Sequence, residues 1–434
     1  MTRTLYLLAL LSACGDNLAA PPDGPRPDAP GPDALAPRWS GVHIGDVLDD
    51  EVLDVELVDG VLYVAGYRDG LLGDNVGPTG DAVGYVRAMS PVDGHTLWEH
   101  LFDTTGADTV DAIDVGATDI ALVGRTSGTF PGEANAGQVD AFVAMLPRSG
   151  GVPAIRQLGD ERPQHFTRIV RDVDGDLLVA GYDDLYRIGN SVADFENSTA
   201  ARIRASDLAV DWYRRDALGA SDQTFALAAT DTAGEIVVGG NVATGPTQGG
   251  HVRRVDAAGV ERWRTRISQI GLDAVTAIER GPDGMIYVAG SSFNLVGNRA
   301  YGEQDVVVAV VDPSTGAIVR AMQAGTSAPD YPRDLVVAAD GTVYVAGETL
   351  GAYPGATNAG LYDLAVVRFA PDGAWTGAWQ HGSDTDETPR SIALGADAVF
   401  LGGYTEGAVL EGVPSNGRTD GFVLRVPLAD LVSP

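Results

Sequence analysis

The sequence has one cysteine, few basic residues and no long amphipathic helical pattern, and each shortage narrows the possibilities. With Cys14 as the only cysteine among 434 residues, the chain has no internal disulfide and no cysteine-based metal cluster. The 29 basic residues are outnumbered by 60 acidic ones, so the net charge is −31 and binding to nucleic acid or to an anionic lipid surface is not expected. Beyond the N-terminus no segment keeps an apolar period of 3.6 residues, which argues against a helical domain.

The chain contains instead a repeated run of six mostly apolar residues that ends in glycine. Runs this short and this rich in β-branched residues predict buried strands rather than helices. Seven copies, spaced 50 to 59 residues apart, predict one domain built from seven copies of one unit. The closing glycines of the seven runs are Gly66, Gly124, Gly181, Gly240, Gly290, Gly347 and Gly403.

Each repeat contains four strand-like runs separated by turn residues. The third run often begins with aspartate, as at Asp140 and Asp363, and the fourth often contains tryptophan, as at Trp98 and Trp379. Asp-Gly pairs between the first and second runs are typical of tight hairpins. Four antiparallel strands in each of seven repeats predict an all-β fold, a seven-bladed β-propeller of four-stranded antiparallel blades.

The two ends of the repeat region complement each other. The last repeat stops after its third run, residues 420–426, and lacks the fourth. A strand-like run with Trp39, residues 38–44, precedes the first repeat. We therefore expect the N-terminal strand to complete the last blade, which closes the ring and removes an open edge. The propeller domain then covers residues 38–434.

The first 37 residues differ in character from the repeats. Residues 5–11 are apolar but too few to span a bilayer, and Leu11-Ser-Ala-Cys14 follows them. These four residues resemble the lipobox of bacterial lipoproteins. The resemblance implies a signal peptide over residues 1–13, lipidation of Cys14 and membrane anchoring in the cell envelope, either periplasmic or at the cell surface. An ordinary secretion signal is the alternative. Residues 14–37 are rich in proline and aspartate and predict an extended tether.

Two repeats carry a more specific signature. Gly128-Thr-Phe-Pro-Gly132 is followed by Asn-Ala-Gly and by Asp140-Ala-Phe-Val, and the same pattern returns from Gly351 to Val366. These residues resemble the SBBP-type β-propeller repeat of bacterial surface and secreted proteins, whereas the third and fourth repeats depart from it. The resemblance implies the fold and the location. It implies no particular enzymatic activity, because that family has none in common.

Acidic residues recur in the connections between the fourth strand of one blade and the first strand of the next. If these connections meet at one end of the ring, their carboxylates form a negative rim that attracts cations or a basic partner. The alternative is that aspartate serves turn formation. The candidate rim residues are Asp50, Glu51, Asp108, Asp160, Glu161, Asp222, Asp273, Asp330, Asp384, Asp386 and Glu387. Ca²⁺ binding is a possibility at the densest group, Asp384 to Glu387.

The first strand of each blade is expected to line the central channel. Aligned near its start are charged residues of both signs, acidic in the first two blades and basic in the third, sixth and seventh. They are consistent with a small ligand held between opposite charges, or with charge pairing between neighbouring blades. The candidate channel residues are Asp54, Asp111, Arg168, Arg333 and Arg390, aligned with Phe225 and Thr276 in the other two blades.

No pattern in the sequence indicates catalysis or a resident cofactor. The six histidines are scattered, so a metal centre is not expected. A GxSxG nucleophile elbow is absent. We therefore expect a monomeric, lipid-anchored, non-catalytic scaffold that binds an envelope protein or polysaccharide. An envelope lyase or hydrolase using the loops or the channel, and a purely structural surface component, are the alternatives.

Overall fold

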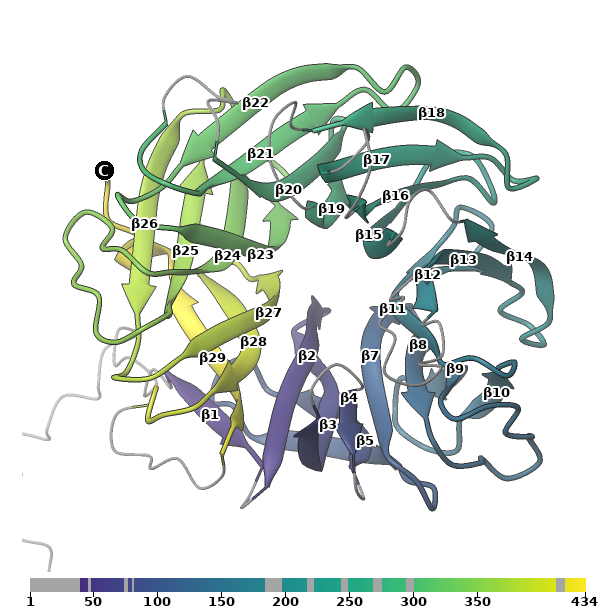
Figure 1. Ribbon diagram of the computed structural model, residues 1–434. Helices are drawn as coiled ribbons and strands as arrows, with labels where there is room; N and C mark the ends of the chain where they lie inside the picture. Colours follow the sequence, from purple (N-terminus) through teal and green to yellow (C-terminus); the bar gives the residue numbers. More distant parts are fainter. Residues whose placement is uncertain are drawn as a thin grey trace, which may run out of the picture. The chain divides into compact units, whose positions relative to one another are not determined.

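The computed structural model is a ring of seven four-stranded antiparallel sheets around a central channel, which confirms the seven-bladed β-propeller (Figure 1). The structure describes residues 40–45, 48–73, 77–79, 82–183, 197–216, 222–242, 249–267, 275–293, 300–410 and 418–434. Trp39–Pro434 form one compact unit. The predicted signal peptide, Cys14, the tether and Trp39 lie outside the described residues.

Each blade runs from an inner strand at the channel to an outer strand at the rim. In blades 1 to 4 the strands, from inner to outer, are β2 (Asp49–Val58), β3 (Val61–Gly73), β5 (Val83–Met89) and β6 (Thr96–Phe102); β7 (Asp108–Val115), β8 (Asp119–Thr126), β9 (Asp140–Pro147) and β10 (Ala154–Leu158); β11 (Gln164–Arg171), β12 (Leu177–Asp183), β13 (Asn197–Ile203) and β14 (Val210–Asp216); β15 (Asp222–Ala229), β16 (Ile236–Val242), β17 (Gly249–Val255) and β18 (Glu261–Arg266). A short additional strand, β4 (Gly77–Thr79), pairs with β3.

The remaining three blades follow the same order. Their strands are β19 (Val275–Arg280), β20 (Ile286–Ser292), β21 (Asp305–Val311) and β22 (Ile318–Ala324); β23 (Asp330–Val337), β24 (Val343–Thr349), β25 (Asp363–Phe369) and β26 (Trp375–His381); β27 (Glu387–Leu394), β28 (Ala398–Thr405), β29 (Asp420–Pro427) and β1 (Gly41–Ile44). One 3₁₀ turn, η1 (Leu428–Asp430), follows β29. No helix within the described ranges is long and apolar enough to cross a membrane.

The core is divided among the seven junctions between neighbouring blades. Each junction contains one cluster of buried apolar side chains from the two sheets that face each other. The repeated apolar run forms the second strand of its blade and contributes to the clusters on both sides. For this reason the run lacks the apolar–polar alternation of a strand with one wet face.

A β-bulge recurs at the same position on every inner strand. In each blade the closing glycine of the second strand pairs with the residue just before the bulge, as Gly124 pairs with Val110. A Cβ on Gly124 would lie 2.0 Å from the Thr109 carbonyl oxygen, and Gly66, Gly181, Gly347 and Gly403 are crowded in the same way. The glycine that marks each repeat is therefore required by the close approach of the inner strand.

Both chain ends of the compact unit are fastened to the ring. β1 pairs with β29 in an antiparallel register from Gly41↔Leu424 to Ile44↔Gly421, so the predicted completion of the last blade is confirmed. The C-terminal segment adds a second attachment that the sequence analysis did not foresee. Val432 and Ala378 exchange two backbone hydrogen bonds of 2.8 Å each, which ties the chain end to the outer strand of blade 6.

Deleting residues 38–44 should destabilise the propeller strongly. The deletion removes Ile44, which is 1% exposed between blades 7 and 1, and leaves β29 as an unpaired edge. We expect the free energy of unfolding to fall by at least about 3 kcal/mol, as for loss of a large buried side chain. Thermal unfolding checks this, with deletion of residues 24–30 from the tether as the length-matched control. An unchanged midpoint in the first variant would disprove the role of β1 in closure.

Candidate functional site

The inner strands β2, β7, β11, β15, β19, β23 and β27 surround the central channel (Figure 1). Each begins at the end of the ring that carries the fourth-to-first and the second-to-third connections, which we call the long-loop end. The longest of these connections, residues 406–419, has 14 residues between two strands. Side chains around each bulge, and those just after each closing glycine, therefore lie at the channel mouth on this end.

Charged side chains at the channel mouth are paired with one another. Arg390, a bulge residue, contacts Glu51 and lies 5.3 Å from the ring centre of Tyr404. The Tyr67 hydroxyl donates to the same Glu51 carboxylate at 3.2 Å. Burial is the main cause that raises the pKa of Tyr67, and it stays a neutral donor. The mouth between blades 7 and 1 is thus a preformed group of aromatic rings around one ion pair.

Two further ion pairs occupy the equivalent positions in other blades. Arg333 pairs with Glu348 of the same blade. Arg125 lies 3.5 Å from Asp111 and 2.9 Å from Nδ1 of His165 on the next blade. The His165 ring in turn stacks on Tyr182, with the ring centres 5.0 Å apart. The charges at the mouth are therefore held in fixed pairs beside aromatic surfaces.

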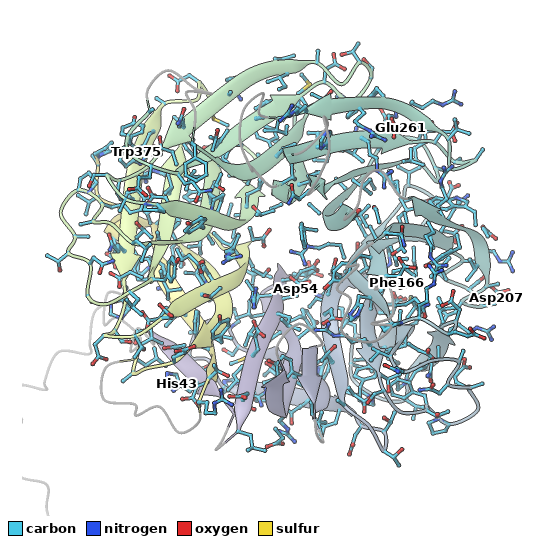
Figure 2. All side chains as sticks on the ribbon, viewed as in Figure 1. His43, Asp54, Phe166, Asp207, Glu261 and Trp375 are labelled. Atoms are coloured by element: carbon cyan, nitrogen blue, oxygen red, sulfur yellow. The ribbon has the colours of Figure 1, made fainter. Side chains whose placement is uncertain are left out.

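Asp54, which Figure 2 labels, lies one layer deeper in the channel, as do Arg168 and Asp334. Each of the three is one residue past its bulge. Burial raises the pKa of Asp54 and raises that of Asp334 to about 6, and the nearby Arg168 guanidinium opposes the rise at both. The charges of Asp54, Arg168 and Asp334, which belong to blades 1, 3 and 6, therefore act on one another in the channel.

The predicted alignment of the five channel residues needs a correction. Asp111, Arg333 and Arg390 occupy the bulge itself, as do Phe225 and Thr276. The bulge residues of blades 1 and 3 are Leu53 and Thr167, so Asp54 and Arg168 are shifted by one residue. The five charged residues consequently belong to two layers, because a bulge inserts one residue that composition does not reveal.

Neighbouring blades are joined by a ladder of hydrogen bonds that no feature singled out in the sequence predicted. The side chain one residue past the bulge accepts from the backbone N–H two residues past the bulge in the next blade. Ile113 N–H donates to Asp54 at 2.8 Å, and Ile392 N–H donates to Asp334 at 3.0 Å. The third such bond runs from Val55 N–H to the Ser391 hydroxyl at 3.3 Å. Each joins the inner strands of two neighbouring blades.

A second layer of the ladder lies two residues further along the inner strands. Its acceptors are Glu56, Asp114 and Glu279, which accept from the backbone N–H groups of Val115, Arg171 and Val337 at 2.7 to 2.8 Å. Burial raises the pKa of Glu56 well above its usual range and that of Glu279 to about 8. Carboxylates spaced two residues apart on an inner strand, as in Asp54 and Glu56, are the signal that would have indicated this layer.

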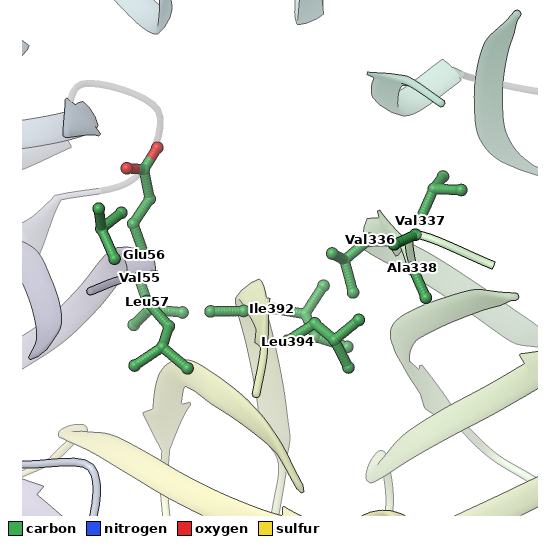
Figure 3. Close-up of a pocket in the computed structure, with 11 residues that line it drawn as sticks. Val55, Glu56, Leu57, Val336, Val337, Ala338, Ile392 and Leu394 are labelled. Carbon is green, nitrogen blue, oxygen red and sulfur yellow. The ribbon is translucent and has the colours of Figure 1, made fainter. Parts of the chain in front are cut away.

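A cavity of about 360 Å³ lies at the opposite end of the channel (Figure 3). Its wall comes from the ends of the inner strands of blades 1, 6 and 7, which contribute Val55, Leu57, Val336, Ile392 and Leu394 among others. Glu56 is the acidic residue in this otherwise apolar lining. The channel is therefore polar and aromatic at the long-loop end and apolar at the turn end.

Five of the predicted rim residues are buried rather than displayed. They are Asp50, Glu51, Asp108, Asp330 and Glu387, each at most 4% exposed. Most of them accept hydrogen bonds from the loop that precedes their strand. Thr104 N–H donates to Asp108 and Thr326 N–H to Asp330, both at 2.6 Å, and Ser383 N–H donates to Glu387 at 2.9 Å. These buried carboxylates thus hold the preceding loops in place. They serve turn formation, which is the alternative to a negative rim that the sequence left open.

The other rim residues that the structure describes are exposed or half-buried. Asp160, Glu161 and Asp384 are exposed and Asp386 is half-buried. Asp160 is paired with Arg215 at 2.9 Å. Asp273 and the side chain of Asp222 lie outside the described part of the chain. Among the described residues there is no group of three or more acidic, histidine or cysteine side chains that could hold a metal ion.

Stability should fall as the pH rises through the titration of Glu279. Its folded-state pKa of about 8 lies above the usual 4.5, so the folded state binds the proton more tightly and its stabilising effect is lost between those two values. The contribution of Glu279 to the free energy of unfolding should drop by up to about 1.4 kcal/mol per pH unit. Chemical denaturation from pH 5 to 8 should show a shallower decline for Glu279→Gln than for wild type. The exposed Glu161→Gln serves as the control, and parallel curves for all three proteins would contradict the assignment.

Comparisons with known proteins identify no family for this chain. No protein-family model matches it, so the SBBP resemblance gains no support there, and no curated protein sequence matches it. Solved structures with a similar fold include the Dos1 propeller, with 9% identity, a TM-score of 0.49 and coverage of 89% of this chain and 94% of that one. They also include Sqt1 from Chaetomium thermophilum (12%, TM-score 0.42, 89% and 98%) and Kuenenia stuttgartiensis hydrazine synthase (11%, TM-score 0.47, 83% and 94%). Likeness at this level carries no argument about function.

Proposed function

We propose that this protein is a non-catalytic binding scaffold of the bacterial cell envelope. Cys14 carries the lipid anchor, and the long-loop end of the channel binds an envelope protein or polysaccharide. The observation that carries the proposal is the channel mouth. Its charged side chains, such as Glu51 with Arg390 and Asp111 with Arg125, are already neutralised by one another. A charged side chain held by its partner is a well-positioned hydrogen-bonding group.

The aromatic side chains at the mouth suit recognition. Tyr182, Tyr331 and Tyr404 are half-buried, so part of each ring is accessible. Tyr331 packs edge-on against Tyr362 with ring centres 5.9 Å apart, and Tyr404 is supported by Arg390. Tyrosine and arginine are enriched where binding energy is concentrated in interfaces, because they offer large contact areas at a low entropy cost. A rigid ring that presents such groups needs little reorganisation to bind.

The anchor rests on the sequence of the N-terminus. An apolar segment too short to span a bilayer, followed by Leu11-Ser-Ala-Cys14, supports lipidation of the cysteine. Acyl chains contribute about 0.8 kcal/mol per buried methylene, so several chains together give stable attachment. The proline-rich tether would then hold the propeller away from the membrane surface.

Replacement of Cys14 by serine should release the protein from the membrane. The serine variant lacks the thiol that accepts the lipid, so it should move from the membrane fraction to the soluble fraction or remain unprocessed. Fractionation of cells expressing each form checks this, and Ser12→Ala, which keeps the cysteine, is the control. Identical membrane retention of the wild type and the serine variant would contradict lipidation of Cys14.

Partner capture should depend on the accessible tyrosines of the channel mouth. The double variant Tyr331→Ala and Tyr404→Ala removes two aromatic surfaces and should reduce recovery of the partner from envelope extract at least tenfold. Val319→Ala, a change on the outer strand of blade 5 where the side chain is 54% exposed, is the control. If the double variant recovers as much partner as the wild type does, the partner binds somewhere other than the channel mouth.

A further inference from the structure

The apolar end of the channel is built by one side of the ring. The cavity of about 360 Å³, which we call the turn-end cavity, is lined by blades 1, 6 and 7. The inner strands of these blades end in Leu57-Val58, Val336-Val337 and Ala393-Leu394. In three of the other blades the corresponding part of the inner strand carries charged residues, which are Asp114, Arg171, Glu279 and Arg280. A row of apolar side chains therefore runs across three adjacent blades.

The turn-end cavity is open to solvent, and the connections at its border lie in the described part of the chain. They are residues 59–60, 338–342 and 395–397, which link the first and second strands of blades 1, 6 and 7. Connections this short turn back at once and do not cover the cavity. Leu57 and Leu394 are accordingly only half-buried. A ligand that removes such side chains from water gains free energy by doing so.

Glu56 supplies the polar side chain of this lining. Its Oε2 atom accepts a hydrogen bond from the Val115 N–H at 2.8 Å. Its Oε1 atom has no hydrogen-bond partner among the described residues and is accessible. The basic residue that acts on it, Arg171, is paired with Asp114 and Asp119. Glu56 is thus a carboxyl group with one free oxygen and without a cation of its own in the described part of the chain.

The carboxyl group and the apolar side chains border the same space. Figure 3 shows Glu56 at one end of a row that continues through Leu57, Ile392 and Leu394 to Val336. A ligand that lies along this row meets apolar surface over most of its length and a hydrogen-bond acceptor at one end.

The charges around Glu56 favour a cationic group at that end. Burial, and then the negative charges of Asp54 and Asp114, raise the pKa of Glu56 well above its usual range, and the Val115 N–H and Arg171 oppose that rise. A ligand cation beside Glu56 relieves this repulsion, whereas an anion adds to it. The net charge of −31 acts in the same direction, because it attracts cations to the protein.

The cavity also limits the size and the kind of the cation. Its volume of about 360 Å³ lies at the lower end of the range of roughly 300–1,000 Å³ that is usual for small-molecule sites. A metal ion such as Ca²⁺ takes about six to eight oxygen ligands, whereas this lining offers one carboxyl group. The apolar row requires an occupant with apolar surface of its own. These features together fit an amine with a compact apolar body.

We propose that the turn-end cavity is a binding site for a small primary amine with an apolar body. The ammonium group donates to Oε1 of Glu56, and the apolar body lies along Leu57, Ile392 and Leu394. Oε2 of Glu56 keeps its bond with the Val115 N–H, so the ladder between blades 1 and 2 stays intact. The site lies at the opposite end of the channel from the mouth that binds the envelope partner, so it adds a second and independent binding function.

The first test compares three ligands by titration calorimetry on the full-length chain at low ionic strength. Phenylbutylamine, phenylbutanol and phenylbutyrate share one carbon skeleton and carry a cation, a neutral hydroxyl and an anion. The amine should bind, the alcohol should bind at least tenfold more weakly because it lacks the charge-assisted hydrogen bond, and the anion should not bind. Absence of amine binding would overturn the site, as would equal binding of the amine and the alcohol.

The second test uses variants of the lining. Glu56→Gln keeps an oxygen for the Val115 N–H but lacks the charge, and it should bind phenylbutylamine at least tenfold more weakly than wild type. The matched control is Glu279→Gln, because Glu279 accepts the Val337 N–H in the same layer of blade 5 but does not line the cavity. The control should stay within threefold of wild type. Equal weakening of the two variants would overturn the site in favour of long-range attraction.

A third measurement follows the protons. An ammonium group beside Glu56 favours the ionised carboxylate, so amine binding at pH 6 should release protons from the wild type and none from Glu56→Gln. Calorimetry in buffers of different ionisation enthalpy measures this release. The neighbouring charges of Asp54, Asp114 and Arg171 are the same in both proteins, and equal proton release by the two would contradict the assignment. Failure of amine binding with continued capture of an envelope partner would reject this site and leave the scaffold function standing.

Discussion

Each blade has an inner strand with one edge unpaired, and the organisation of the channel follows from how that edge is satisfied. Backbone N–H groups on such an edge cost free energy when they are buried without an acceptor. The carboxylates of Asp54, Glu56 and Asp114 supply acceptors from the preceding blade, each at 2.8 Å. The raised pKa values of Asp54 and Glu56 are the cost of placing acids where the next strand needs an acceptor.

The bulge makes this arrangement possible. An ordinary strand turns successive side chains to opposite faces, so one side chain of a pair would point away from the channel. A bulge re-aims neighbouring side chains and increases the local twist. Arg333 can therefore meet Glu348 at the mouth while the adjacent Asp334 reaches the N–H of Ile392 on the next blade. Closing glycines such as Gly347 leave room for the inner strand at this point. The β-bulge thus determines which side chains form both layers of the channel.

The sequence predicted the parts of this fold that repeat. Seven glycine-terminated runs fixed the number of blades, and the unfinished last repeat predicted β1 as its closing strand. The sequence could not predict which residue of an inner strand is the extra one. A bulge changes no composition, and the neighbours Leu53 and Asp54 both fit a strand near a channel. The candidate rim acids were equally ambiguous, because Asp330, which is buried at the start of β23, and Asp384, which is exposed, lie in similar polar stretches of sequence. Whether such an acid is buried or exposed depends on the path of its loop, which the residue types do not reveal.

Blades 3 and 4 depart from the rules that hold the other junctions together. At the positions of the ladder, β11 has Arg168 and Val170 and β15 has Ala226 and Ala228, so these two strands offer no carboxylate to the next blade there. At its turn end the junction between blades 3 and 4 is joined by Gly234 N–H, which donates to the buried Asp172 at 2.8 Å.

Arg202 reinforces that turn-end attachment through Asp172, at 3.1 Å, and through Asp176, at 3.0 Å. The opposite part of the same junction has a smaller apolar cluster among the described residues and is joined by polar side chains. The Thr167 hydroxyl donates to the Thr224 carbonyl at 3.3 Å, and Arg253 donates to the Ser198 hydroxyl at 2.7 Å. Polar contacts between blades 3 and 4 therefore take the place of the carboxylate ladder that joins the inner strands of other described blades.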